Sequence, residues 1–452
     1  MMASAGNVKG VELGFLEKPD AKTDLTSAHF PSKVGGKPAW LELQQLPSPE
    51  QLACNVCKKP MVLLIQLYAP MRKRPPSYHR SVYVFMCRDR ACHQRGGGRL
   101  AFKVLRSQLP QTNEFYEFSA CSDSDSDLDA NCPEPLGSPS RSQTGGSGRR
   151  RGSNEDVLKE FREQMASSFP YEMEATSMKK PTSASDEDDS CGFLSSSLDD
   201  KMLDSMSSQT LPQQTGERHL PTLCTVCGAR GPKRCGKCRK VAYCSQEHQR
   251  HDWRSGHQLF CTDIAGGKRT EADVDYVPSR GVLLLEFEVV TEEEPEVVAS
   301  PAEKSEEEKM EDFYRFARTS SLRKTEKKAV EQAKSEHTTD KLFRAFKKRI
   351  AIEPEQVVRY HRSGDPLLVS EEGIPSASDI PICECGAARV FEFQVMPQLL
   401  YFLKLDAVSS PSIDWGTLLV YTCSNSCNMK PGYVEEFLWK QDFSDSSRKS
   451  AK

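Results

Sequence analysis

Eight cysteine and histidine residues in the middle of the chain fall into four closely spaced pairs. The pairs are Cys224/Cys227, Cys235/Cys238, Cys244/His248 and His257/Cys261. Thiolates and imidazoles are the ligands that zinc prefers, and four of them complete a closed tetrahedral site. Residues four apart share one face of a helix, so each of the last two pairs offers two ligands to one ion. The spacing therefore predicts two zinc ions, which supply the folding energy of a module with little apolar core.

Two further groups of four cysteines lie towards the two ends of the chain. They are Cys54, Cys57, Cys87 and Cys92 in the first group, and Cys383, Cys385, Cys423 and Cys427 in the second. Zinc ribbons bring together two knuckles that are far apart in sequence, so we expect one zinc site with four cysteine ligands at each end. Packing of free cysteines as small buried hydrophobic residues is the alternative. His93 is an alternative ligand to its neighbour Cys92, although the other group has cysteine at that place.

The sequence around the two outer groups follows the same order at both ends. Each end has a knuckle, an apolar strand that contains glutamine, a strand that ends in cysteine, a second knuckle and a third strand. The expected strands are 61–67, 82–87, 100–105, 391–395, 418–423 and 437–439, which are rich in β-branched and aromatic residues. This repeat predicts that the two ends pack into one pseudo-symmetric β domain.

The composition divides the chain into five segments. They are 8–118 and 341–445 as the two halves of the β domain, 119–216 as a disordered Ser/Asp-rich insert, 217–265 as the zinc module, and 266–340 as a strand followed by an acidic linker. The insert has too few apolar residues to bury a core. The expected fold is mainly β with small α elements: a pseudo-duplicated, zinc-ribbon-like β domain formed by the two terminal segments and interrupted by disordered linker and the zinc module.

Three elements are expected in the second half of the chain. Alternating apolar residues predict a strand at 281–290, and the next segment, 291–312, has ten acidic and two basic residues and is expected to be a solvated linker. Apolar residues at helical spacing predict an amphipathic helix at 341–352, which Pro354 should end.

Composition and motifs exclude several classes of protein. The formal net charge of −3 gives no global basic field for nucleic acid, and no apolar run approaches the length of a membrane span. The first residues lack the basic and apolar regions of a signal peptide, and Cys-x2-Cys pairs suit a compartment that keeps thiols reduced. We therefore expect a soluble protein of the cytoplasm and nucleus that contacts no membrane.

No catalytic constellation accompanies the expected metal sites. Each site has four protein ligands, which leaves no position for a reactive water. Neither a His-Glu-x-x-His pair nor a His-x-Glu deaminase signature occurs. Segment 217–261 has nine basic and three acidic residues, a modest basic face that suits an acidic partner better than base recognition. We expect neither an enzyme nor a protein that binds nucleic acid directly.

The central ligand string resembles the MYND-type zinc finger, including its Tyr243-Cys244-Ser245 sequence and Trp253. His248 stands where that family most often has cysteine, and imidazole serves equally as a ligand. The pairs interleave in that family. The resemblance therefore implies one set of Cys224, Cys227, Cys244 and His248, and another of Cys235, Cys238, His257 and Cys261. MYND fingers typically bind short peptides, so the resemblance also implies a peptide or corepressor as a partner.

With its two ends included, the chain resembles the programmed cell death protein 2 family, in the branch that carries a MYND finger. Besides the cysteines, the matching stretches are 11–15, 32–41, 393–400 and 413–416. The resemblance implies a non-enzymatic chaperone that captures a newly made small-subunit ribosomal protein and delivers it to 40S assembly. Acidic stretches at 123–129, 186–189 and 292–312 would complement a basic client, or would only keep the chain soluble.

A second hypothesis is a nuclear regulator of transcription, cell death and proliferation that recruits corepressors through the finger, with DNA association. It predicts that the finger cysteines are essential for the biological effect and the terminal cysteines are not. The chaperone hypothesis predicts one ribosomal protein at near-stoichiometric yield in a pull-down.

Overall fold

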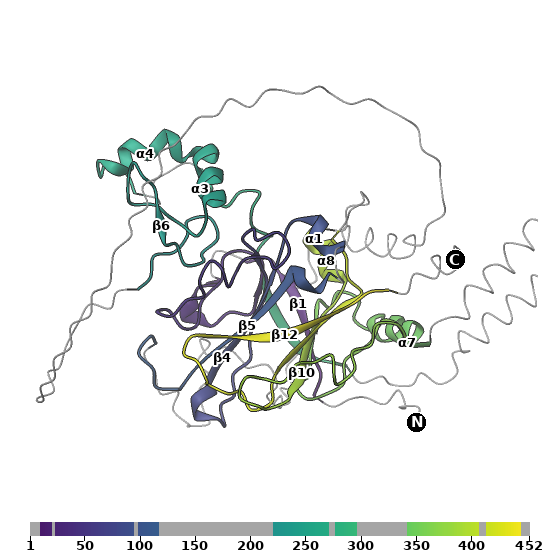
Figure 1. The fold of residues 1–452 in the computed structure, drawn as a ribbon. Coiled ribbons are helices and arrows are strands. Elements are labelled where there is room, and N and C mark those ends of the chain that lie inside the picture. Colours follow the sequence, from purple (N-terminus) through teal and green to yellow (C-terminus); the bar gives the residue numbers. More distant parts are fainter. Residues whose placement is uncertain are drawn as a thin grey trace, which may run out of the picture.

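The strands of both chain ends close into one barrel in the computed structural model (Figure 1). The structure describes residues 10–19, 23–94, 98–116, 220–270, 276–295, 341–405 and 413–443. The barrel strands are β1 (Glu12–Glu17), β2 (Lys33–Val34), β3 (Val62–Tyr68), β4 (His79–Met86), β5 (Phe102–Leu109), β8 (Phe287–Glu293), β9 (Val358–Tyr360), β10 (Arg389–Val395), β11 (Thr417–Cys423) and β12 (Tyr433–Gln441). The short helices of these segments are η1 (Ser27–His29), η2 (Pro75–Ser77), α1 (Arg90–Gln94), η4 (Arg99–Ala101), α7 (Lys341–Ile350) and α8 (Gln398–Phe402). The expected mainly β fold with small α elements is confirmed.

Two three-stranded units form the two halves of the barrel. Strands β3, β4 and β5 pair in order in the N-terminal half, and β10, β11 and β12 pair in order in the C-terminal half, all antiparallel. The halves join where β5 pairs with β12, from Val104 opposite Glu436 to Ser107 opposite Tyr433. Every residue of β3 and β11 is buried, which explains their continuous apolar sequences. The terminal segments therefore form one domain, as the repeat predicts.

An exchange of strands joins the halves on the other side of the barrel. Strand β1, from the start of the chain, pairs with β9 of the C-terminal half, while β8 pairs with β2 of the N-terminal half. Strands β1 and β8 pair with each other over six residues, from Glu12 opposite Glu293 to Glu17 opposite Glu288. Gly14 of β1 has no room for a side chain, because a Cβ would lie 3.0 Å from Val358. Barrel closure thus needs the segment after residue 280 as well as both chain ends.

The expected boundary between strand and acidic linker is wrong. The strand expected at 281–290 is β8 (Phe287–Glu293), so the first residues of the expected linker belong to the barrel. Glu294 follows β8 and is buried, because its carboxylate forms ion pairs with Arg349 and Arg359. Glu292 and Glu293 thus belong to a paired strand, and two guanidinium groups balance the charge of Glu294. These acidic residues had suggested a solvated segment. The rest of that linker, the insert 119–216 and the acidic stretches 123–129 and 186–189 lie outside the described residues.

The two halves share details that only a repeated fold explains. The β3–β4 pairing shifts register between Leu63 and Ile65, and the β10–β11 pairing shifts at the matching place, between Phe391 and Phe393. The glutamine of each apolar strand clamps the backbone of a crossing loop. Gln66 Oε1 accepts the N–H of Ala39 at 3.0 Å, and Gln394 Oε1 accepts the N–H of Leu367 at 2.7 Å. The side-chain N–H groups of both glutamines donate to the carbonyls of the same two loop residues.

Helix α7 begins at the expected residue and ends at Ile350, before Pro354. Its apolar face packs Phe346 and Ile350 against Val369 and Met396 of the C-terminal half. None of the described helices is long and apolar enough to cross a membrane.

The central module lies to one side of the barrel (Figure 1). Its elements are β6 (Lys233–Arg234), β7 (Ala242–Tyr243), α3 (Gln246–Asp252), the π-helical turn η5 (Trp253–His257) and α4 (Gln258–Ala265). Trp40 connects it to the N-terminal half of the barrel, because its indole Nε1 donates to the carbonyl of Gly228 at 2.7 Å. Arg88 makes a second link, donating to the carbonyls of Gly281 and Val282 just beyond the module.

Candidate metal centres

The structure brings all sixteen predicted ligands into four clusters of four, and in each cluster the ligand atoms lie within 4.8 Å of one another. The clusters are Cys54/Cys57/Cys87/Cys92, Cys224/Cys227/Cys244/His248, Cys235/Cys238/His257/Cys261 and Cys383/Cys385/Cys423/Cys427. The central module therefore has the interleaved pairing that the MYND resemblance implies. Each terminal cluster joins two knuckles of its own half of the barrel.

The spacing within the clusters fits a tetrahedral zinc ion. Zinc–sulfur bonds of about 2.3 Å place two sulfur ligands about 3.8 Å apart. Five sulfur–sulfur separations in the four clusters match this value: Cys57–Cys87 at 3.6 Å, Cys227–Cys244 at 3.6 Å, Cys235–Cys261 at 3.8 Å, Cys383–Cys427 at 3.5 Å and Cys385–Cys423 at 3.6 Å. With four protein ligands each, such sites are closed and structural.

The four first knuckles share a similar turn, which is one residue shorter in the Cys383-Glu-Cys385 pair. In each, the residue after the second cysteine has positive φ and donates its N–H to the carbonyl of the first cysteine. These residues are Lys58 (φ 61°), Gly228 (φ 72°), Arg239 (φ 57°) and Gly386 (φ 82°). The turn points both thiols of a pair to one side. It is shared by the short Cys383-Glu-Cys385 pair, which shows that this tighter spacing also makes a knuckle.

In the first cluster of the central module, a helix N-terminus positions the imidazole. Ser245 caps α3, its hydroxyl accepting the backbone N–H of His248 at 3.1 Å. His248 Nδ1 then lies 3.1 Å from Cys244 Sγ and 3.7 Å from Cys224 Sγ. Burial lowers the pKa of His248, but hydrogen bonds with these two sulfur atoms prevail and raise it to about 10. A zinc ion would supply the positive charge that this buried, electron-rich environment favours.

The second cluster has a buried carboxylate behind its histidine. His257 Nε2 faces Cys235 and Cys238, while Nδ1 lies 4.0 Å from Asp252 Oδ2. Asp252 is fully buried and accepts a hydrogen bond from the Tyr243 hydroxyl at 2.7 Å. At 4.0 Å the two groups are not hydrogen-bonded, but a carboxylate on this side of the ring is the partner that a metal-bound imidazole commonly has. Asp252 was not identified from the sequence. Its position between the two helical ligand pairs, Cys244/His248 and His257/Cys261, could have indicated it.

The N-terminal cluster contains Cys92 rather than His93. The ring of His93 is turned away, with Nε2 2.7 Å from the carbonyl oxygen of Cys87. His93 therefore supports the backbone of a knuckle instead of offering a ligand atom. Lys59 binds Asp89 at 3.2 Å and joins the two knuckles at the surface.

The thiols of these clusters have pKa values shifted in both directions. Burial and neighbouring sulfur atoms raise the pKa of Cys92, Cys261 and Cys383 to about 12. A backbone hydrogen bond from Ala387 lowers the pKa of Cys385 to about 7. Without a cation, the thiols of one cluster do not all ionise at neutral pH, whereas zinc binding deprotonates them together. Among the described residues these clusters hold the strongest candidate chemistry.

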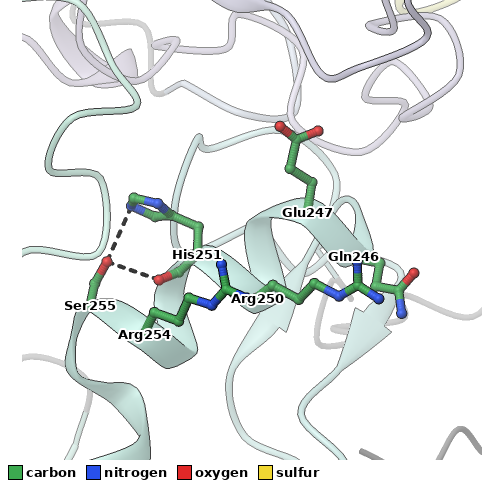
Figure 2. Close-up of a pocket in the computed structure, with 6 residues that line it drawn as sticks. All are labelled: Gln246, Glu247, Arg250, His251, Arg254 and Ser255. Carbon is green, nitrogen blue, oxygen red and sulfur yellow. Dashed lines mark hydrogen bonds between the residues drawn. The ribbon is translucent and has the colours of Figure 1, made fainter. Parts of the chain in front are cut away.

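A shallow hollow lies on the exposed side of the central module, along α3 and η5 (Figure 2). The residues that line it are Gln246, Glu247, Arg250, His251, Arg254 and Ser255. Ser255 donates to the carbonyl of His251 at 2.9 Å, which fixes the turn of backbone between them. The exposed Arg250 and Arg254 lie one helical turn apart and make this face basic.

Three family models match the chain. Residues 10–123 match the programmed cell death protein 2 N-terminal domain, 340–442 match the programmed cell death protein 2 C-terminal putative domain, and 224–261 match the MYND finger. The two domain matches coincide with the two halves of the barrel, apart from β8. The finger match begins and ends on predicted ligands, Cys224 and Cys261.

Full-length relatives are similar over nearly the whole chain. Programmed cell death protein 2 of Bos taurus is 36% identical over 442 residues, covering 96% of this chain and 97% of the relative. The protein of that name from Mus musculus is 37% identical, with the same coverage. A more distant relative in Schizosaccharomyces pombe, named probable 20S rRNA accumulation protein 4, is 34% identical over 129 residues, or 25% of this chain and 31% of that protein. No solved structure matches significantly.

Proposed function

Because this chain belongs to the programmed cell death protein 2 family, we propose that it is a zinc-binding chaperone that captures a newly made small-subunit ribosomal protein and supports 40S assembly. The observation that carries the proposal is the similarity to the fission yeast relative, whose name refers to accumulation of an rRNA. Ribosomal proteins are basic, so a chaperone for one of them needs acidic surface.

The barrel offers such a surface on the ribbon of β1 and β8. These two strands contain five glutamates and no lysine or arginine. Glu12 lies opposite Glu293, and Glu17 lies opposite Glu288. Glu17 and Glu292 are exposed on this ribbon, and exposed carboxylates complement a cationic client that docks on the joined halves.

Affinity purification from cells, followed by mass spectrometry, tests this role. We expect one small-subunit ribosomal protein at near-stoichiometric yield, and a lower yield with Glu292→Lys on the exposed end of β8. Glu114→Lys places the same charge reversal on an exposed residue away from that ribbon and should keep the client. A broad set of chromatin factors with no enriched ribosomal protein would contradict the proposal.

The four ligand clusters support a structural role for four zinc ions, two in the finger and one at each end of the barrel. Each cluster has four protein ligands, and such closed sites stabilise folds rather than activate water. We therefore propose a protein without enzymatic activity. Native mass spectrometry should find four zinc ions per chain; two ions would restrict zinc to the finger.

The finger is proposed to bind a peptide or a corepressor as an accessory partner. Its match to the MYND model and its exposed basic face on α3 support this role. The same face supports the alternative function, a nuclear regulator of transcription and cell death that recruits corepressors. Under that alternative, Cys244→Ala abolishes the cellular effect and Cys423→Ala does not, whereas a barrel-based chaperone loses its effect with Cys423→Ala.

Residence in both cytoplasm and nucleus follows from the proposed role, since ribosomal proteins are made in one compartment and assembled in the other. Imaging of the full chain fused to a fluorescent protein should show signal in both compartments. Exclusion from the cytoplasm would favour the transcriptional alternative.

A further inference from the structure

We propose that Arg106 and Gln108 of β5 are positioning residues for the C-terminal cysteine cluster, although both lie in the N-terminal half of the barrel. That metal site is then complete only when the two halves are joined. This inference rests on the zinc ion proposed above for that cluster.

The loop from Cys423 to Cys427 carries two of the four ligands, and side chains from outside the loop hold its carbonyl groups. Arg362 donates to the carbonyls of Cys423 and Ser424 at 3.0 and 3.2 Å. The other two held carbonyls belong to Ser426 and Cys427 and receive their hydrogen bonds from β5. Ser426 has φ of 40°, an uncommon conformation for a residue other than glycine, so the loop needs such contacts to keep its shape.

The β5 side chains reach the loop across the junction of the halves. Arg106 Nη2 donates to the carbonyl of Cys427 at 3.0 Å, and Gln108 Nε2 donates to the carbonyl of Ser426 at 3.0 Å. Arg106 also donates to the side-chain oxygen of Gln108, which fixes the two donors relative to each other. These partners are more than 300 residues apart in sequence. No contact within the C-terminal half replaces them among the described residues.

A buried carboxylate connects the same guanidinium to the other cysteine of the loop. Glu436 accepts Arg106 Nε at 2.7 Å on one oxygen and the backbone N–H of Cys423 at 3.1 Å on the other. Arg389 binds the second oxygen at 2.9 Å and donates to the carbonyl of Ile382, just before the first knuckle. Arg106 is therefore one member of a network that reaches both knuckles.

The network also places positive charge beside the cluster. Arg106 Nη2 lies 3.9 Å from Cys427 Sγ, and the Arg106 side chain is fully buried. Four thiolates and one zinc ion carry a net charge of −2, which a buried guanidinium stabilises. Residues that hold ligands in this way commonly change metal affinity by about 10- to 100-fold when they are replaced.

Among the described residues, no side chain of the C-terminal half holds a carbonyl of the N-terminal knuckles in this way. When the two halves are compared strand by strand, Met86 occupies the position equivalent to Thr422. The position equivalent to Glu436 is then Phe102, and the position equivalent to Arg106 is Lys440. Lys440 pairs with Asp442 rather than with a carbonyl of the N-terminal knuckles. The knuckle carbonyl of Cys87 is bound by His93 of the same half. One cluster is thus assembled locally, and the other requires the opposite half.

Zinc counting on the full chain tests the proposal. We expect Arg106→Met to retain three zinc ions by native mass spectrometry. Among the fourteen cysteines of the four clusters, alkylation should be confined to the four C-terminal ones. Gln108→Leu removes neutral hydrogen bonds without exposing a buried charge, and should release that zinc to a chelator about 10-fold faster. Arg106→Lys, which keeps a charged donor, should give an intermediate rate.

Arg80→Met is the matched control. Arg80 is a fully buried arginine of β4 that pairs with Glu392 of the C-terminal half, yet it donates to no carbonyl of the loop. It should lower stability while all four zinc ions remain. Equal zinc loss from Arg80→Met and Arg106→Met would overturn the proposal, because general loosening would then explain both.

Two other outcomes distinguish failure of the positioning role from failure of the proposed zinc site. If the C-terminal cysteines of the wild-type protein are alkylated freely, the proposed zinc at this cluster is wrong and the inference falls with it. If the wild type is loaded and both Arg106→Met and Gln108→Leu release zinc at its rate, only the positioning role is overturned.

Discussion

The finger and the barrel gather the same kinds of ligand in very different surroundings. In the finger, both clusters lie within residues 224–261, and the buried side chains around them are few. In the barrel, the clusters lie at the ends of strands such as β3 and β11, whose residues are all buried. The ligand clusters of the finger therefore take the place of a core, as is typical of small zinc modules, whereas those of the barrel lie at the ends of a core formed by the strands.

The two halves of the barrel differ in a related way. The N-terminal half has Leu64 and Phe102 where the C-terminal half has Glu392 and Glu436. Burial alone would raise the pKa of the Glu392 carboxyl, but the Arg80 guanidinium lowers it to about 2. The C-terminal half is therefore charged inside, and the arginines that balance it come partly from the other half.

Removal of zinc should give the largest difference between finger and barrel. Structural zinc contributes about 10 kcal/mol or more to small zinc modules, so a chelator should unfold the finger. The barrel should keep most of its strand structure because of its apolar core. Hydrogen exchange measured by mass spectrometry would show full exchange across 224–261 and continued protection of β3 and β11. Simultaneous loss of protection in both regions would contradict the comparison.

Replacement of Arg80 tests the charged interior of the C-terminal half. Arg80→Met leaves Glu392 without its main partner and should cost about 3 kcal/mol in the free energy of unfolding. The double variant Arg80→Met/Glu392→Leu should recover part of this loss, because leucine occupies the matching position 64, whereas Arg362 loses its ion pair with Glu392. Urea denaturation gives both values. Additive losses in the double variant would show that the pair does not act as a unit.

A smaller effect is expected where the finger docks on the barrel. Trp40→Phe removes the indole N–H that binds Gly228 and should weaken docking by about 1 kcal/mol. Faster hydrogen exchange around residue 228, with unchanged zinc content, would report this loss. Trp415→Phe is the control, since it removes a similar bond, to the carbonyl of Met396, inside the barrel. Equal exchange in both variants would contradict a docking role for Trp40.

A further effect concerns pH and belongs to the barrel alone. Burial, with a lesser contribution from Arg72, lowers the pKa of His79 from 6.5 to about 4. Between these values the unfolded chain binds a proton that the folded protein does not, so stability falls as the pH drops below about 6.5. His79→Asn should reduce the slope of stability against pH between 7 and 5.5, measured by urea denaturation. Parallel slopes for variant and wild type would show that His79 contributes nothing.

Much of the candidate site was predictable because its determinants are local. A knuckle occupies about five consecutive residues, and the i, i+4 pairs Cys244/His248 and His257/Cys261 follow from helix geometry. The strands of each half were predictable from apolar runs, and the helix α7 from its periodicity. The start of the acidic linker was predicted wrongly, because the pairing of Glu294 with Arg349 and Arg359 leaves no local trace.

The candidate ligands, the repeat and the mainly β character can be inferred from the amino-acid sequence, since spacing and apolar patterning act over a few residues. The exchange of β1 and β8 and the partners of the charged residues inside the strands depend on the folded barrel. Arg80 meets Glu392 and Arg106 meets Glu436 across 312 and 330 residues, distances over which no periodic pattern extends. Arg106 and Glu392 interrupt apolar strands in the printed sequence. This pattern indicates a buried charge, but it does not indicate which residue forms the ion pair with it. Barrel closure determines these ion-pair partners, because it brings the two halves of the chain into contact.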